Sequence, residues 1–298
     1  MRNLLALLFV TIIFNFYAKN TALIIGIGDY DLESTGWPKI HGDNDVKLLE
    51  QKFEDINFNV STLINEEATK DNIIRALGKL TKNVETGDNI YIHFSGHGQP
   101  VEDINGDEPD GLDQSFICYD ACFSSKFNLD GNSYLGQNHL IDDELFPYMS
   151  DLKNKVGEHG RVIIVFDSCY SGGADRGDIK DENNEDSEIQ FLTITRGSSD
   201  EFRATKNVAE YLKHINTPDL YNPLGGEVLV LSACPRDKKN FECQEKSSGL
   251  SFGSLSYCIG KMIDNGIPID QWKEFFETKK FREYQIFRFS QKPIVETH

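Results

Sequence analysis

Two runs of largely apolar residues dominate the hydrophobic pattern of the chain. Residues 162–166 read Val-Ile-Ile-Val-Phe, and residues 89–94 read Asn-Ile-Tyr-Ile-His-Phe. Because apolar residues do not alternate regularly with polar ones, each run is expected to form a strand that is covered on both faces, as in a parallel sheet between helices. Similar strands are predicted at residues 21–27, 60–64 and 227–231.

Helical patterns alternate with these strands. Residues 69–82 place Ile73, Ile74, Leu77 and Leu80 on one side of a helix. Strands that alternate with helices are typical of a doubly wound α/β fold, so the central sheet is expected to be mostly parallel. Further helices are predicted at residues 43–53, 143–152, 250–262 and 271–279, and a late strand at residues 284–289.

Cys169 is a candidate nucleophile because of its position after the strand at residues 162–166. It stands three residues past Phe166, between Asp167 and a turn of small residues at 171–173. Ligand sites in parallel α/β sheets lie beyond the carboxyl ends of the strands, so the sulfur is expected to be exposed at that end. The alternative is an inert structural thiol.

The second apolar run leads to a histidine. Residues 89–94 are followed by Ser95-Gly96-His97-Gly98. A cysteine nucleophile needs a partner that takes and returns protons near neutral pH, and a histidine at the end of a neighbouring strand suits that role. The glycines beside His97 allow backbone N–H groups to approach a substrate carbonyl. The other histidines carry no such context and are interpreted as structural.

These residues resemble the hallmarks of the caspase-like cysteine peptidases, and specifically of the metacaspases. The matching motifs are SGHG at residues 95–98 and DSCYSG at residues 167–172, and the resemblance covers nearly the whole chain after the N-terminus. It implies a caspase-like three-layer α/β/α sandwich with a mostly parallel central sheet. In such an enzyme Cys169 attacks the substrate, His97 moves the proton, and the N–H groups of Gly98 and Cys169 hold the oxyanion.

The residues two positions before the catalytic pair indicate a basic specificity. Asp167 precedes Cys169 and Ser95 precedes His97, and alternate side chains of a strand share a face. The resemblance to metacaspases adds Asp45 to the same pocket. Two carboxylates and a hydroxyl favour arginine or lysine and repel aspartate. As an alternative, Asp167 only anchors the turn through hydrogen bonds to the backbone.

Acidic residues concentrate between residues 100 and 114, as in a solvated acidic loop or, alternatively, a cation site. Hard oxygen ligands suit calcium, although Glu108 and Gln114 stand where an EF-hand loop requires glycine and glutamate. The resemblance implies that Ca²⁺ activates the enzyme, although the spacing of the last ligand from Cys169 is one residue short. Asp142 is alternatively a cap for the helix that follows it. The ligands implied by the resemblance are Asp113, Asp142, Asp143 and Asp175.

The composition of the chain limits the classes of molecule that it is expected to bind. The chain has 298 residues and a formal net charge of −18, and 39% of its residues are hydrophobic. This length is enough for a sizeable core without disulfides. The negative charge argues against nucleic-acid binding and favours cationic partners, here peptide or protein substrates with Arg or Lys at the cleavage site.

The N-terminal residues 1–19 resemble a secretory signal. An apolar run from Leu4 to Tyr17 follows Arg2 and is too short for an ordinary spanning helix. An uncleaved membrane anchor is the alternative, because Phe16 is bulky for a position near a cleavage site. The predicted location is the secretory pathway or the extracellular space, with membrane-anchored and cytoplasmic locations left open.

Residues 20–298 are expected to form one caspase-like peptidase domain, with a large portion at 20–174 and a small portion at 208–298. The acidic stretch 175–207 between them has little hydrophobic periodicity and is predicted to be a flexible linker where self-cleavage occurs. Its basic residues are Lys180, Arg196, Arg203 and Lys206.

The sequence thus predicts a calcium-activated cysteine endopeptidase of metacaspase type, made as a zymogen, that cleaves after Arg or Lys. Cys234 also follows an apolar strand, but no glycine-rich turn comes after it, and it is interpreted as structural. Two alternatives remain open. One is a catalytically silent caspase-fold protein with a binding or regulatory role, and the other is a legumain-like peptidase.

Overall fold

The central element of this computed structural model is a six-stranded sheet with the order β14-β11-β9-β3-β1-β2. Five strands are parallel, and β14 runs antiparallel to β11. The mostly parallel sheet predicted from the sequence is confirmed. Its strands are β1 (Asn20–Gly26), β2 (Asn59–Ile64), β3 (Asn89–Ser95), β9 (Arg161–Asp167), β11 (Glu227–Ser232) and β14 (Ile294–Thr297). The structure describes residues 18–103, 105–106, 108–129, 132–170, 187–202, 225–236, 238–288 and 291–298.

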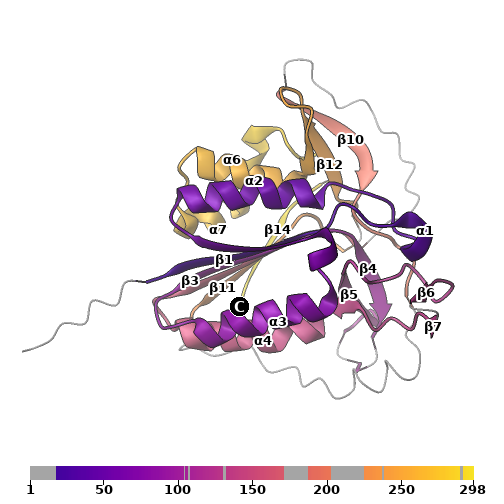
Figure 1. The fold of residues 1–298 in the computed structure, drawn as a ribbon. Coiled ribbons are helices and arrows are strands. Elements are labelled where there is room, and N and C mark those ends of the chain that lie inside the picture. Colours follow the sequence, from indigo (N-terminus) through magenta and orange to yellow (C-terminus); the bar gives the residue numbers. More distant parts are fainter. Residues whose placement is uncertain are drawn as a thin grey trace, which may run out of the picture.

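Helices cover both faces of this sheet and complete the three layers (Figure 1). The apolar strands bury side chains on both faces of the sheet. Ile92 and Ile164 lie in one buried cluster, while Tyr91 and Ile163 lie in the other. The three-layer sandwich is therefore confirmed. One face carries α2 (Gly42–Asp55), α6 (Ser254–Asp264) and α7 (Trp272–Glu277), and the other carries α3 (Lys70–Asn83) and α4 (Asp142–Val156).

Two small antiparallel sheets add to the central one. In the first, β4 begins three residues after β3 ends, so the chain passes from the central sheet through His97 into this sheet. The first sheet contains β4 (Gly98–Glu102), β5 (Leu112–Ile117) and β8 (His139–Ile141), and the second contains β10 (Ile189–Thr195), β12 (Phe241–Glu245) and β13 (Ser251–Gly253). The remaining elements are α1 (Leu32–Thr35), the hairpin strands β6 (Asn128–Leu129) and β7 (Asn132–Ser133), and the 3₁₀ turns η1 (Asn65–Glu67), η2 (Ile269–Gln271) and η3 (Lys280–Tyr284).

Three sequence predictions are wrong in detail. The helix expected at 250–262 begins only at Ser254, because the residues before it pair as β13. The late strand expected at 284–289 is absent from the described part of that segment, where η3 ends at Tyr284. The third prediction is wrong for the described part of the expected flexible linker, because residues 187–202 contain β10, which pairs with β12. Residues 175–186 and 203–207 of that linker lie outside the described residues.

The N-terminal prediction cannot be compared with the fold, because residues 1–17 lie outside the described residues. Within the described part of the chain, no helix combines the length and the apolar character needed to cross a bilayer.

Candidate active site

The pairing of β3 with β9 brings the two candidate catalytic residues to the same level of the sheet. Ser95 and Asp167 are direct partners in this parallel pair. Cys169 and His97 each follow two residues later, so they leave neighbouring strands at the same end. Both are buried, with exposed fractions of 0% and 1%. The expectation of an exposed sulfur is wrong, because another segment of the chain covers this end of the strands.

The hydrogen bonds of His97 define which nitrogen can act as a base. Its Nε2 lies 2.8 Å from the carbonyl oxygen of Pro38, to which it donates. Its Nδ1 is buried and has no hydrogen-bond partner among the described residues. Burial lowers the pKa of His97 to about 4, although the Pro38 carbonyl opposes this shift. The ring stacks on Trp37 with 4.8 Å between centroids. His97 is thus a neutral, fixed base with its lone pair at Nδ1.

The segment that covers Cys169 is the one containing Arg196 and Gly197. The N–H of Cys169 and the N–H of Gly98 both donate to the carbonyl oxygen of Arg196, at 2.9 and 3.2 Å. These are the two N–H groups that the sequence assigned to an oxyanion hole. The close approach requires glycine at 197, since an added Cβ would lie 1.8 Å from the carbonyl oxygen of Cys169.

Beyond Gly197 the same segment continues along β4. The N–H of Ser198 donates to the carbonyl of Gly98 at 3.0 Å, and the N–H of Phe202 donates to the carbonyl of Pro100 at 2.9 Å. With β10 before Arg196 and these bonds after it, residues 189–202 lie across the candidate catalytic residues by strand-like pairing on both sides. This is how an extended peptide is held when it adds to sheet edges.

The Arg196 side chain fills the pocket that the sequence predicted for a basic residue. It is fully buried, and its Nη1 lies 2.7 Å from Asp45 Oδ2 and 2.6 Å from Ser95 Oγ. Ser95 in turn donates to Asp45 at 2.6 Å. Gly253 forms part of the wall, since a Cβ there would lie 2.5 Å from the same nitrogen. The structure therefore brings Asp45, Ser95 and Asp167 together around one guanidinium.

Asp167 contributes less directly than Asp45. Its Oδ2 accepts from the N–H and the hydroxyl of Ser256 at 2.7 and 2.6 Å, and its Oδ1 accepts from Asn240 at 2.6 Å. The same Oδ2 is 3.9 Å from Arg196 Nη1. Asp167 is thus anchored by hydrogen bonds and also lies close to the Arg196 guanidinium.

Sequence reasoning missed Glu242, the third carboxylate of this pocket. Its Oε1 accepts from Arg196 Nε at 3.1 Å and from Nη2 at 2.9 Å. On its other side, His41 donates its backbone N–H to Oε1 at 2.8 Å and places Nδ1 2.5 Å from Oε2. No motif marks Glu242 in the sequence, where it is one of two acidic residues in the stretch FECQE.

The electrostatics of the pocket depend on Arg196. Burial raises the pKa of Asp45 to about 7, even though Arg196 opposes the shift. Burial would also raise the pKa of Glu242, but Arg196 and His41 hold it below its ordinary value. The carboxylates raise the pKa of Arg196 against the effect of burial. The Arg196 cation therefore lowers the pKa of both Asp45 and Glu242 relative to burial alone and favours their ionised forms.

The predicted calcium ligands are only partly assembled by the described residues. Asp142 Oδ1 accepts from the N–H of Gln114 at 3.2 Å, next to Asp113 in β5, and Asn105 donates to Asp143 Oδ2 at 2.6 Å. Asp142 is the first residue of α4 and not its cap, so the capping alternative is wrong.

Asp142 lies close to other acidic side chains. Burial, Asp143 and Glu108 raise its pKa to about 7. Within the described ranges no group of three or more His, Cys, Asp or Glu side chains is placed to hold a metal ion. Asp175, the fourth predicted ligand, lies outside these ranges, so these residues alone do not complete a calcium site.

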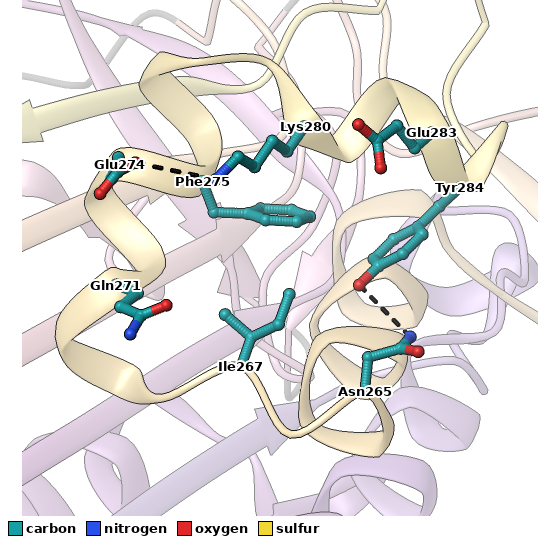
Figure 2. Close-up of a pocket in the computed structure, with 8 residues that line it drawn as sticks. All are labelled: Asn265, Ile267, Gln271, Glu274, Phe275, Lys280, Glu283 and Tyr284. Atoms are coloured by element: carbon teal, nitrogen blue, oxygen red, sulfur yellow. Dashed lines mark hydrogen bonds and ion pairs between the residues drawn. The ribbon is translucent and has the colours of Figure 1, made fainter.

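A second hollow lies away from these residues. A cavity of about 370 Å³ lies between the end of α6, α7 and η3. Figure 2 shows its lining residues, with Lys280 paired to Glu274 and the Tyr284 hydroxyl hydrogen-bonded to Asn265. Its lining residue Ile267 also borders a cavity next to Asn20, the first residue of β1. The hollow therefore lies toward the opposite end of the sheet from Cys169, and none of the described residues that line it is a cysteine or histidine.

Comparison with known proteins identifies relatives of this chain. Metacaspase-1 of Schizosaccharomyces pombe is 26% identical over 276 residues, covering 82% of this chain and 60% of that protein. Metacaspase-1 of Pyricularia oryzae is 32% identical over 168 residues, covering 52% of this chain and 37% of that protein. The chain thus spans less than two thirds of the length of these relatives.

A solved structure and a family model extend the comparison. The crystal structure of protein GSU0716 from Geobacter sulfurreducens has a TM-score of 0.61 at 22% identity, covering 94% of this chain and 93% of that one, and it shows that the two share a fold. The family model described as Caspase domain (Peptidase_C14) matches residues 19–281. This chain belongs to the caspase-domain family of cysteine peptidases.

Proposed function

We propose that this protein is a cysteine endopeptidase that cleaves peptide bonds after arginine or lysine. The observation that carries this proposal is Arg196. Its guanidinium lies among Asp45, Ser95, Asp167 and Glu242, while its carbonyl oxygen accepts from the N–H groups expected to hold an oxyanion. A basic side chain and the carbonyl that follows it thus occupy the pocket and the reaction centre at once.

The proposed reaction uses groups of this chain and one water molecule. His97 accepts the thiol proton of Cys169 at Nδ1, and the sulfur attacks the carbonyl carbon of the basic residue in the pocket. The N–H groups of Cys169 and Gly98 stabilise the negative charge on the oxygen. His97 then gives its proton to the leaving amine, and water hydrolyses the thioester to release the carboxylate and restore the thiol.

Arg196 also suggests that the intact chain blocks itself. We propose that residues 189–202 occupy the cleft as a substrate does, and that the enzyme cuts its own bond between Arg196 and Gly197. A segment of the same chain competes with added peptides at an effective concentration of the order of 1 mM. The uncut protein is then a zymogen, and the cleavage site lies within the stretch 175–207 predicted from the sequence.

A panel of fluorogenic peptides tests the proposed specificity. Peptides with Arg or Lys at the cleaved residue should give kcat/KM values at least about 100-fold above those with Asp or Asn, because only a cation pairs with the buried carboxylates. The peptides differ at that residue alone. Preferential cleavage after Asn would instead support a legumain-like enzyme. No cleavage of any peptide, with intact folded protein, would support a silent caspase-fold binding protein.

Calcium activation is a further proposal, supported by the crowding of Asp142 against Asp143 and Glu108. A divalent cation relieves repulsion between carboxylates and so favours their ionised, ordered arrangement. Peptidase activity should therefore rise with Ca²⁺, and Asp143→Ala should raise the Ca²⁺ midpoint at least about tenfold. The measurement is activity titrated with Ca²⁺ after treatment with chelator.

The matched control for calcium is Asp151→Ala, which removes an exposed carboxylate from the same helix. This variant should keep the wild-type midpoint. Full activity in excess chelator would contradict calcium activation. The proposed peptidase reaction would not be affected by that result.

A further inference from the structure

We infer that Glu242 is a specificity-determining residue, which makes the pocket select arginine over lysine. This inference rests on the proposed function and refines it. Arg196 is held from two directions: Asp45 and Ser95 contact Nη1, whereas Glu242 contacts Nε and Nη2. The two sets of contacts use different edges of one planar guanidinium.

Lysine cannot make both sets of contacts. Its ammonium is a single nitrogen, while the guanidinium presents five N–H donors in a fixed plane. An ammonium placed where Nη1 lies would keep Asp45 and Ser95, but Oε1 of Glu242 would lose both of its contacts with the substrate side chain. A buried carboxylate that loses hydrogen bonds to a cation destabilises the complex, so lysine binds less well than arginine.

The position of Glu242 is fixed by its neighbours. It lies in β12, directly opposite Gly253 of β13, and the missing side chain at Gly253 leaves room for the guanidinium. His41 holds both carboxylate oxygens through its backbone N–H and its ring. Because Glu242 is buried and held in this way, it cannot turn to follow a shorter side chain. A preorganised acceptor of this kind discriminates between ligands by geometry as well as by charge.

The test uses the purified full chain with Ca²⁺ and two fluorogenic peptides that differ only in Arg or Lys at the cleaved residue. The wild-type protein should favour the Arg peptide by about 10- to 100-fold in kcat/KM, which corresponds to one or two charge-assisted hydrogen bonds. Glu242→Gln should bring this ratio close to 1. The change should come mainly from a higher KM for the Arg peptide, with kcat preserved, because Glu242 contacts the pocket side chain and not the reacting atoms.

Glu245→Gln is the matched control. Glu245 lies in the same strand but accepts from Tyr257 and Ser248 instead of contacting Arg196. This variant should keep the wild-type Arg/Lys ratio. If Glu242 had only a structural role, Glu242→Gln would lower kcat/KM for the Arg and Lys peptides equally. That result would overturn the inference.

The wild-type ratio decides the question even if Glu242→Gln does not fold. Equal cleavage of the Arg and Lys peptides by the wild-type protein would overturn the selectivity of Glu242 while leaving the proposed function intact. Absence of cleavage after either residue would overturn the proposed function itself, and with it this inference.

Discussion

Cys169→Ala should abolish peptide cleavage and self-cleavage, with a fall in kcat of at least about 10³-fold, because no other group replaces the attacking sulfur. The protein should stay folded. The change removes one atom from a buried side chain, and the main-chain bond from Cys169 N–H to the Arg196 carbonyl is kept. The measurements are kcat on an Arg peptide and the thermal unfolding midpoint.

Cys234→Ala is the control for Cys169. Cys234 follows β11 and is buried as Cys169 is, and its Sγ donates to the carbonyl of Lys238 at 3.2 Å. Its loss should cost about 1 kcal/mol of stability and leave kcat unchanged. If Cys234→Ala lost activity and Cys169→Ala kept it, the assignment of the nucleophile would be reversed.

The placement of the proposed catalytic pair was predictable because its signals are local. Each apolar run from residues 89–94 and 162–166 forms a strand buried on both faces, and the parallel pairing of β3 with β9 puts His97 and Cys169 beyond the same end of neighbouring strands. The residues two positions earlier, Ser95 and Asp167, enter the pocket by the same register. Strand periodicity therefore carried information about the site as well as about the fold.

The rest of the pocket was not predictable in this way, because its contacts join distant parts of the chain. Glu242 is separated from Arg196 by 46 positions and from His41 by 201. No local periodicity records such pairings. The acidic composition of residues 175–207 favoured a flexible linker, whereas residues 189–202 are ordered by the pocket and by β4 and β12, which compensate for their weak hydrophobic pattern.

Arg196→Gln should both stop cleavage at residue 196 and unblock the uncut enzyme. Without its guanidinium, the segment no longer competes for the pocket, so the rate on an added Arg peptide should rise about tenfold or more. This follows from an effective concentration near 1 mM set against KM values of the order of 0.1 mM. The measurements are initial rates of uncut protein and mass spectrometry of the fragments.

The loss of Arg196 also leaves buried carboxylates without their cation, at a cost of about 3–5 kcal/mol if no water enters the pocket. Thermal unfolding is therefore measured beside the rates. The matched control is Arg161→Gln. Arg161 is the first residue of β9 and pairs with Glu227, so its loss should change neither the rate nor the fragments.

The wild-type protein supplies a readout that needs no substitution. Its self-cleavage should produce a new N-terminus at Gly197, since the carbonyl of Arg196 is the one that accepts from the N–H groups of Cys169 and Gly98. Cleavage only after Lys180, Arg203 or Lys206, three residues outside the described ranges, would contradict the assignment of this bond. An Arg196→Gln protein that is folded but no faster on added peptides would identify Arg196 as a permanent part of the pocket wall. Displacement of Arg196 by substrate is thus the step on which the proposed regulation depends.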